Sequence, residues 1–398
     1  MQIDTARASR SPRAFIVSVA VGTRAGAGHE AADALDETRQ LTVSAGFEIA
    51  GELAARRERP DAAFFLGSGK VEELGDLVAG SGASVVVFDV ALTPAQQRNL
   101  EGSLKVAVLD RELLILEIFA QRAKSSEGKL QVEVAQLEHL ATRLVRGWTH
   151  LERQRGGLGK TGGPGEKQIE LDRRLISVRV KRLRERLKAL GRQRRTQRRA
   201  RARRDVFSVS LVGYTNAGKS TLFNALTRAA AYAADQLFAT LDTTSRRCFV
   251  AGEIEVVASD TVGFIRGLPH QLVDAFKSTL EESVEADLLL HVVDASSPAR
   301  DAQMAEVDRV LGEIGAGEVP RLLVFNKIDR LQRSATVERD ACGTIRAVFL
   351  SAASGDGIDL LRTAIAERVH AARMAAAQAR PSPGIPMPAA ASLASAPK

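Results

Sequence analysis

The sequence predicts an α/β protein of three parts: a small N-terminal α/β domain, a long antiparallel helical hairpin, and a second α/β domain with a mostly parallel sheet. Short apolar runs alternate with helix-like stretches over the first 110 residues and again from Val206 to about His370. This alternation is typical of parallel sheets covered by helices. Between these regions lie two amphipathic segments joined by a glycine-rich link, which favours a helical hairpin.

Length and composition restrict the class of protein. A chain of 398 residues with 45% hydrophobic and 26% charged residues is typical of a globular protein of two to three domains. Two cysteines are too few for a disulfide framework or a zinc site, and they favour a reducing, cytoplasmic compartment. No apolar run is long enough to cross a membrane. The run Phe15–Val21 lacks the cleavage site of a signal peptide, and its β-branched residues favour a strand.

The first α/β domain is expected over residues 1–126. Helices are expected near Ala31–Val43 and Val71–Ala79, and a third helix begins where the N-cap residue Thr93 precedes a proline. The expected strands are Phe15–Val21, Phe47–Leu53, Val85–Val90 and Val106–Leu109.

The tetrapeptide GSGK at Gly67–Lys70 resembles part of a phosphate-binding loop. Phe64 stands where such a loop needs its first glycine, and Val71 replaces the magnesium-binding hydroxyl. We therefore expect a turn that opens a helix here, with a second nucleotide contact as the alternative.

The helical hairpin is expected over residues 127–204. Apolar residues recur at spacings of four and three in two segments, which predicts two helices that pair along these seams. The first seam consists of Leu130, Val134, Leu137, Ala141, Leu144, Trp148 and Leu151, and the second of Ile169, Ile176, Val180, Leu183, Leu187 and Leu190.

The link between the two helices, Gly156–Gly165, holds six glycines in ten residues and is flanked by basic side chains. A plain hairpin loop is one interpretation. The other is a basic tip that enters a cavity lined by RNA, where small size and positive charge are both useful.

Positive charge is concentrated in the second helix and after it. Residues 181–204 hold thirteen basic side chains and one acidic side chain, so the rest of the chain carries a net charge of −4 within a total of +8. Such a cluster favours binding to a phosphate backbone, although a solvated linker is the alternative. Pro381–Lys398 holds five of the twelve prolines, and we expect residues 371–398 to form a disordered Ala/Pro tail.

The third region, residues 205–370, begins with the strand Phe207–Val212 and a G-x-x-x-x-G-K-[ST] loop before a helix. Backbone N–H groups of such a loop surround phosphates, Lys219 reaches the β and γ phosphates, and Ser220 supplies a hydroxyl to Mg²⁺. The phosphate-binding residues are Gly213, Tyr214, Thr215, Asn216, Ala217, Gly218, Lys219 and Ser220.

Three further motifs follow at the ends of predicted strands, and together they predict a guanine-nucleotide site. Asp260 organises Mg²⁺ and the N–H of Gly263 senses the γ-phosphate. Asp329 accepts two hydrogen bonds that guanine can donate and adenine cannot. The motifs are Asp260, Thr261, Val262 and Gly263; Asn326, Lys327, Ile328 and Asp329; and Ser351, Ala352 and Ala353.

A switch segment is expected between the phosphate loop and Asp260, and we assign it to Phe238, Ala239, Thr240, Leu241 and Asp242. Such a segment offers a hydroxyl to Mg²⁺ while the γ-phosphate is present. Thr240 is the candidate ligand, with Thr243 and Thr244 as alternatives.

The residue after Gly263 is Phe264, where many GTPases place a glutamine that orients the attacking water. Intrinsic hydrolysis is therefore expected to be slow and to need a partner or a monovalent cation. Asn216 is a candidate ligand for a cation such as K⁺, and capping of the loop is its alternative role.

The chain resembles the HflX family of ribosome-associated GTPases over roughly residues 12–370. The resemblance depends on four stretches. They are LQVEVAQLEHLATRLVRGWTHLERQRGG at Leu130–Gly157, GPGEKQIELDRR at Gly163–Arg174, ADQLFATLD at Ala234–Asp242 and DTVGFIRGLPHQLVDAFKSTLEE at Asp260–Glu282.

The resemblance implies a GTPase whose N-terminal domain and hairpin bind the large ribosomal subunit and its RNA, with the tip near the peptidyl-transferase region. In the GTP state it would split stalled or stress-arrested ribosomes, with a role in protein synthesis or ribosome biogenesis. It implies Ser220 and Thr240 as Mg²⁺ ligands and Lys219, Thr240, Asp260 and Gly263 as the catalytic set.

Three alternatives belong to other classes. A ribosome-assembly or RNA-binding scaffold would use GTP only as a stabilising ligand. An RNA remodeller would hydrolyse ATP in the N-terminal domain, which the incomplete GSGK motif disfavours. A membrane-surface GTPase would use the Arg run, but Gly191–Arg204 has no large apolar residue to insert. Nothing in the sequence requires more than a monomer.

Overall fold

A computed structural model of the chain describes residues 11–22, 27–146, 164–202, 206–228, 237–238, 240–251, 254–268 and 277–379. The expected hairpin tip up to residue 163 and the expected tail from residue 380 lie outside this part of the chain.

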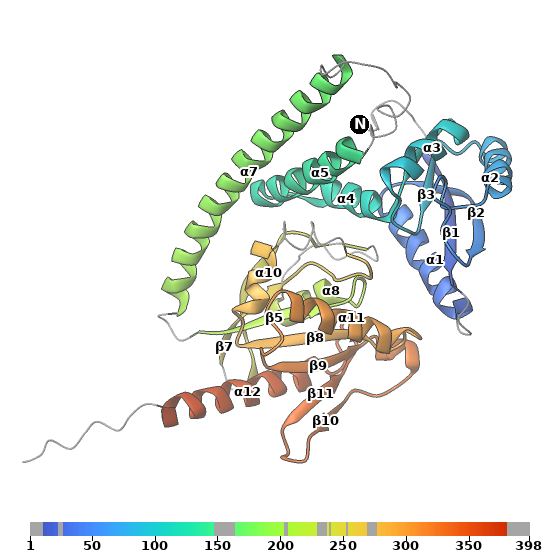
Figure 1. Ribbon diagram of the computed structural model, residues 1–398. Helices are drawn as coiled ribbons and strands as arrows, with labels where there is room; N and C mark the ends of the chain where they lie inside the picture. Colours follow the sequence, from blue (N-terminus) through green and yellow to red (C-terminus); the bar gives the residue numbers. More distant parts are fainter. Residues whose placement is uncertain are drawn as a thin grey trace, which may run out of the picture.

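The N-terminal domain is a four-stranded parallel sheet in the order β2-β1-β3-β4, with helices on both faces (Figure 1). One face packs on α1 and α4 and the other on α2 and α3, which explains why β1 is apolar along most of its length. The elements are β1 (Arg13–Val21), α1 (Ala27–Ser44), β2 (Glu48–Arg57), α2 (Ser68–Ser81), β3 (Val85–Phe88), α3 (Pro94–Leu104), β4 (Ala107–Leu109) and α4 (Arg111–Arg122).

The four predicted strands and three predicted helices are all present, and Thr93 closes a capping box with Gln96 at the start of α3. Helix α4 is absent from the sequence prediction because its run LLILEIFA is apolar apart from Glu117 and shows little helical period. The structure explains the run, since Leu114, Ile115, Leu116, Ile118 and Phe119 are all buried. GSGK opens α2 as expected.

The hairpin consists of α5 (Ser126–Arg146) and α7 (Pro164–Ala202), which pack against each other along the predicted seams. Leu183 is 1% exposed, and the ion pairs Arg179–Glu133 and Arg184–Glu138 join the two helices beside it. Helix α7 continues through Gly191, so the expected Arg-rich linker is helical at least to Ala202. Straight-chain Arg and Gln side chains favour such a continuation.

The second α/β domain is a seven-stranded sheet in the order β10-β11-β9-β8-β5-β7-β6, antiparallel only at its two edge strands. Helices α8 and α12 cover one face, and α10 and α11 lie on the other (Figure 1). The strands are β5 (Phe207–Gly213), β6 (Thr244–Phe249), β7 (Glu255–Asp260), β8 (Leu288–Asp294), β9 (Arg321–Asn326), β10 (Thr336–Arg339) and β11 (Ile345–Phe349). The helices are α8 (Lys219–Thr227), α10 (Lys277–Val284), α11 (Arg300–Glu313), the 3₁₀ helix η3 (Ile328–Leu331) and α12 (Ile358–Ala379).

Helix α12 continues to Ala379, past residue 371, where the sequence prediction placed the start of a disordered tail. Its last turns read AARMAAAQA, and alanine has the highest helix propensity of all residues.

The two α/β domains share a hydrophobic core. Buried side chains of α1 and α4, such as Leu41 and Phe119, belong to one cluster with Phe238, Leu241 and Phe264 of the second domain. The nucleotide-binding motifs of the second domain therefore lie next to the N-terminal domain. Among the described residues, no helix combines the length and the apolar character needed to cross a membrane.

Candidate guanine-nucleotide site

The phosphate loop connects β5 to the N-terminus of α8, so backbone N–H groups and the positive end of the helix dipole point into one cleft. Gly218 has φ +91°, and a Cβ there would collide with the side-chain nitrogen of Asn326. Lys219 is 6% exposed, and its Nζ donates to the carbonyl oxygens of Gly213 at 3.1 Å and Tyr214 at 2.8 Å. Burial lowers the pKa of Lys219 to about 8, and nearby Asp260 opposes this shift.

Three oxygen-bearing side chains meet where Ser220 and Thr240 line the cleft, with the buried carboxylate of Asp260 behind them. Ser220 Oγ lies 2.7 Å from Thr240 Oγ1 and donates to Asp260 Oδ2 at 2.7 Å, and Thr240 Oγ1 donates to the same oxygen at 3.0 Å. Asp260 is 1% exposed, and its burial raises the pKa of the carboxyl group. Its other oxygen, Oδ1, has no hydrogen-bond partner among the described residues.

This cluster fits a magnesium ion. Mg²⁺ prefers hydroxyl, carboxylate and water oxygens, and an unpartnered buried carboxylate oxygen is costly without a cation or water. Of the three candidate threonines, Thr240 is the one whose hydroxyl bonds Ser220 and Asp260 in the described part of the chain.

The side of the cleft expected to hold the base is organised by Asn326, which is 2% exposed. Its Nδ2 donates to the carbonyl oxygen of Ala217 at 2.9 Å, and its Oδ1 accepts from the N–H of Ala352 at 2.9 Å. Asn326 therefore ties the phosphate loop to the Ser351–Ala353 loop. Asp329 lines the cleft, as a carboxylate that recognises guanine must.

Lys327 forms a 2.8 Å ion pair with Asp294 at the end of β8. Although burial opposes ionisation of Asp294, hydrogen bonds from Lys327 and Ser296 lower the pKa of its carboxyl group. The sequence analysis missed Asp294 because no motif marks it. The signal that could have found it is its position at the end of a buried strand beside the predicted cleft.

The cleft has a volume of about 310 Å³ and brings together most of the predicted contacts. Those that line it are Thr215, Asn216, Gly218, Lys219, Ser220, Phe238, Thr240, Thr261, Gly263, Asn326, Lys327, Asp329, Ser351, Ala352 and Ala353. Gly213, Tyr214, Ala217, Leu241, Asp242, Asp260, Val262 and Ile328 do not line it, and Ala239 lies outside the described residues.

Phe264 supports the loop and does not line the cleft. Its ring is fully buried, and its backbone pairs with the loop through Phe264 N–H to Gly213 O at 3.1 Å and Thr215 N–H to Phe264 O at 2.7 Å. Asn216 faces the cleft with φ +59°, a left-handed conformation that Asn tolerates, and its side chain makes no hydrogen bond within the described part of the chain. Its two predicted roles, cation ligand and loop residue, both stay predictions.

The N-terminal domain contacts both the phosphate loop and the segment after Gly263. Glu37 of α1 accepts hydrogen bonds from Tyr214 Oη and from Arg111 of α4. Arg111 also donates to the carbonyl oxygen of Arg266 at 3.0 Å, and the N–H of Arg266 donates to Tyr214 Oη at 2.9 Å. Burial, followed by the charge of Glu37, raises the pKa of Tyr214 far above its usual range.

Three known families match successive parts of the chain. A family described as "GTP-binding GTPase N-terminal" matches residues 32–120, and "GTP-binding GTPase Middle Region" matches residues 122–201. A third, described as "50S ribosome-binding GTPase", matches residues 208–327.

Similar proteins extend over most of the chain. A protein named GTPase HflX from Escherichia coli is 54% identical over 84% of this chain and 79% of its own length. Another of the same name, from Magnetococcus marinus, is 49% identical over 85% of this chain and 78% of its own. The crystal structure of SsGBP in complex with GDP has the same fold, with a TM-score of 0.50 and 24% identity over 91% of this chain and 99% of that one.

Proposed function

This chain belongs to the HflX family of GTPases, and we propose that it binds the large ribosomal subunit and uses GTP to split stalled or stress-arrested ribosomes. It hydrolyses GTP as the other members of the family do. The observation that carries the proposal is that one chain combines a cleft lined by the guanine-nucleotide motifs with a basic hairpin.

The cleft supports specificity for GTP and GDP. Asp329 would accept the N1–H and 2-amino groups of guanine, the backbone of Ala352 would contact O6, and Lys327 would lie along the base. Lys219 would bind the β and γ phosphates, and the N–H of Gly263 would sense the γ-phosphate. Adenine would leave the Asp329 carboxylate without donors, at a cost of about 1–3 kcal/mol.

Ser220 and Thr240 would hold Mg²⁺ directly, and Asp260 would organise its shell through Oδ1. The ion neutralises the charge that develops on the phosphates during hydrolysis. With Phe264 buried, this chain has no side chain in the glutamine position that could orient the water, so we expect the ribosome to complete the site.

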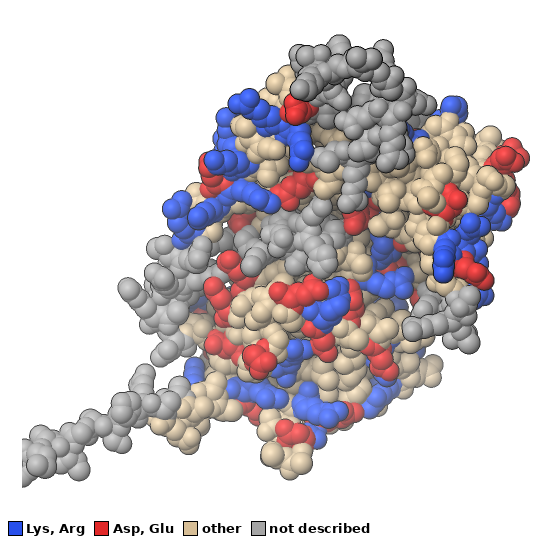
Figure 2. Space-filling view, in the orientation of Figure 1, with Lys and Arg blue, Asp and Glu red and all other residues tan. Residues whose placement is uncertain are grey.

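The hairpin supports an RNA partner. Lys and Arg side chains gather along α7 (Figure 2), and Arg182, Arg186 and Lys188 are exposed there. A line of exposed cations on a helix releases counterions from a phosphate backbone. We propose that the tip, Gly156–Gly165, enters the peptidyl-transferase region of the RNA. A ribosomal partner implies a cytoplasmic protein, and one copy suffices.

The test is GTP hydrolysis by the full chain with and without purified large subunits, together with subunit binding in GTP and GDP. We expect strong stimulation, tighter binding in GTP, and loss of GTP-dependent binding in Lys219→Ala. A variant lacking Gly156–Gly165 should keep its basal GTPase rate and lose binding. If both variants bound the subunit as the wild type does, the proposal would be contradicted. Subunit binding that is the same in GTP and GDP would favour the assembly scaffold.

Asn216 gives the proposal a second, smaller test. If it holds a monovalent cation beside the phosphates, replacing K⁺ by Na⁺ should slow basal hydrolysis in the wild type and have no effect in Asn216→Ala. Equal rates of the wild type in both salts would leave the ribosome as the sole activator.

A further inference from the structure

The switch segment, Phe238–Asp242, is packed into the N-terminal domain. Phe238 is 2% exposed, and its ring meets that of Phe119 in α4 edge to face, with 4.6 Å between ring centres. Phe238 also has φ +55°, an unfavourable conformation for a bulky side chain. Such a conformation persists only where its surroundings hold it, and here the surroundings are another domain.

Asp242 binds the start of α5. Its Oδ2 accepts from the N–H groups of Lys124 at 2.9 Å and Ser125 at 2.8 Å, and its Oδ1 accepts from the hydroxyl of Ser125. Ser125 Oγ in turn accepts from the N–H of Gly128 at 2.8 Å, as an N-cap residue does. Asp242, which lies 117 residues after Ser125 in the chain, therefore holds the N-terminus of the first hairpin helix with its carboxylate. The helix dipole favours negative charge at this end.

Gly128 makes this contact possible. A Cβ at position 128 would overlap Asp242 Oδ1 and also lie 3.2 Å from Ser125 Oγ. No φ constraint applies here, because Gly128 lies in the first turn of a regular helix. The lack of a side chain therefore serves the approach of Asp242.

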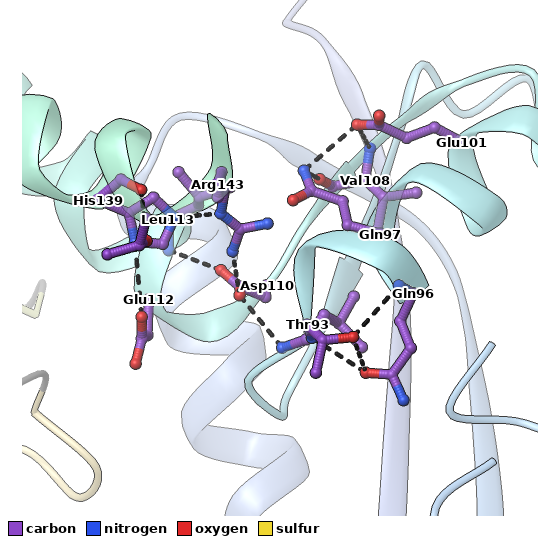
Figure 3. A network of polar contacts seen from close by, with 12 residues as sticks. Thr93, Gln96, Gln97, Glu101, Val108, Asp110, Glu112, Leu113, His139 and Arg143 are labelled. Atoms are coloured by element: carbon purple, nitrogen blue, oxygen red, sulfur yellow. Dashed lines mark hydrogen bonds and ion pairs between the residues drawn. The ribbon is translucent and has the colours of Figure 1, made fainter. Parts of the chain in front are cut away.

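The far end of α5 is fixed to the N-terminal domain by a buried polar network (Figure 3). Asp110, 1% exposed, accepts from Arg143 at 2.7 Å and from the N–H groups of Leu92 and Leu113. Arg143 Nε also donates to His139 Nε2 at 2.6 Å. Helix α5 is therefore held at one end by the N-terminal domain and at the other by the switch segment.

We infer that Asp242 is a positioning residue for GTP hydrolysis. Its hydrogen bonds to the start of α5 hold the switch segment so that the Thr240 hydroxyl, two residues away, stays beside Ser220 and Asp260. The first hairpin helix is then part of the support of the metal site. This inference rests on the proposed role of Thr240 as a Mg²⁺ ligand.

The first test measures the GTPase rate of the full chain against Mg²⁺ concentration in Asp242→Ala. We expect the Mg²⁺ concentration for half-maximal rate to rise about tenfold. This is the lower end of the loss of metal affinity that follows removal of a group that orients a metal ligand. Asp287→Ala is the matched control. It also removes a carboxylate that accepts from a backbone N–H and a hydroxyl, both of Ser208, but it lies away from the cleft. This control should keep the wild-type Mg²⁺ dependence.

The second test disturbs the contact between Gly128 and Asp242 by changing the hairpin residue. Gly128→Ala should raise helix propensity, so thermal stability should be kept while the Mg²⁺ requirement rises as in Asp242→Ala. Gly102→Ala in α3, where a Cβ meets open space, is the control. In the double variant, Gly128→Ala should add nothing to Asp242→Ala, because both remove one interaction.

Thr240→Ala distinguishes a wrong metal site from a wrong role of Asp242. If it leaves the Mg²⁺ dependence unchanged, the proposed metal site is wrong. If Thr240→Ala raises the Mg²⁺ requirement but Asp242→Ala does not, or if the effects of Asp242→Ala and Gly128→Ala add in full, the inference on Asp242 is overturned while the metal site stands.

Discussion

The wall of the cleft formed by the phosphate loop and the Ser351–Ala353 loop rests mainly on the sheet of its own domain, whereas the wall that carries Thr240 rests on the N-terminal domain. On the first wall, Asn326 joins the phosphate loop to the Ser351–Ala353 loop through hydrogen bonds within one domain. On the second, Phe238 and Asp242 are held by Phe119 and by the start of α5.

This difference assigns the two walls to different tasks. A wall supported mainly by its own sheet, with Tyr214 as its contact to the N-terminal domain, depends less on the position of that domain, which suits constant recognition of guanine. A wall supported by a second domain moves when that domain is displaced, which suits a switch. Each of the following changes should affect one wall more than the other.

Phe119→Ala should have the largest effect, because it removes the ring against which Phe238 packs. Loss of a fully buried phenylalanine costs about 3–5 kcal/mol. We expect denaturant unfolding of the N-terminal domain at lower concentration and a slower GTPase, with GDP affinity nearly unchanged. Phe249→Ala, at a phenylalanine that is 62% exposed, is the control. A large loss of GDP affinity in Phe119→Ala would show that the walls are not independent.

Asn326→Ala should damage the other wall. It leaves Ala217 O and Ala352 N–H without their buried partner, at a cost of about 1–3 kcal/mol for each group. GDP and GTP should therefore both bind at least tenfold more weakly in equilibrium titration. Asn99→Ala removes a comparable side-chain bond, to Ala63 O, at an exposed position and should bind normally. If only the affinity for GTP fell and that for GDP did not, Asn326 would not have the role assigned to it here.

Acid should weaken the sheet beneath the first wall. His291 of β8 is 2% exposed, and burial lowers its pKa from 6.5 to about 4. Between these values the unfolded chain binds a proton that the folded chain does not. The free energy of unfolding therefore has its full value above pH 6.5 and falls as the pH drops toward 4. At pH 5 it is lower by about 2 kcal/mol.

His291→Gln should remove that part of the pH dependence in denaturant unfolding between pH 7 and 5. His370→Gln, at an exposed histidine of α12, should leave it in place. An equally steep loss of stability in His291→Gln would assign the acid sensitivity to other groups.

The sequence predicted the parts of the molecule that local patterns determine. Strand–loop–helix spacing located the phosphate loop, and the order of short motifs located Asp260, Asn326 and Asp329 at the ends of their strands. Apolar seams predicted the pairing of the hairpin helices, and Thr93 marked the start of α3. These features depend on neighbours along the chain or on the common end of a parallel sheet.

The contacts between domains could not be predicted in the same way. Asp242 looked like a nucleotide contact because it follows Thr240, but its partners lie more than a hundred residues earlier. Glu37 and Tyr214 carry no shared pattern that would pair them. Helix α4 was missed because most of its residues are apolar and buried, so that its narrow exposed face at Glu117, Ala120 and Gln121 gives a weak helical period.

Because α7 is long, a small rotation at one end of the helix displaces its other end by several ångströms. The helix has 39 residues and, at about 1.5 Å per residue, a length of about 58 Å. One end adjoins the glycine-rich tip, and the other is a few residues from β5, the strand that enters the phosphate loop. A tilt of about 5° at the β5 end would carry the opposite end about 5 Å, more than the rise of about 3.4 Å between stacked bases. A lever of this kind would turn a small rotation near β5 into a movement of several ångströms at the far end of the hairpin.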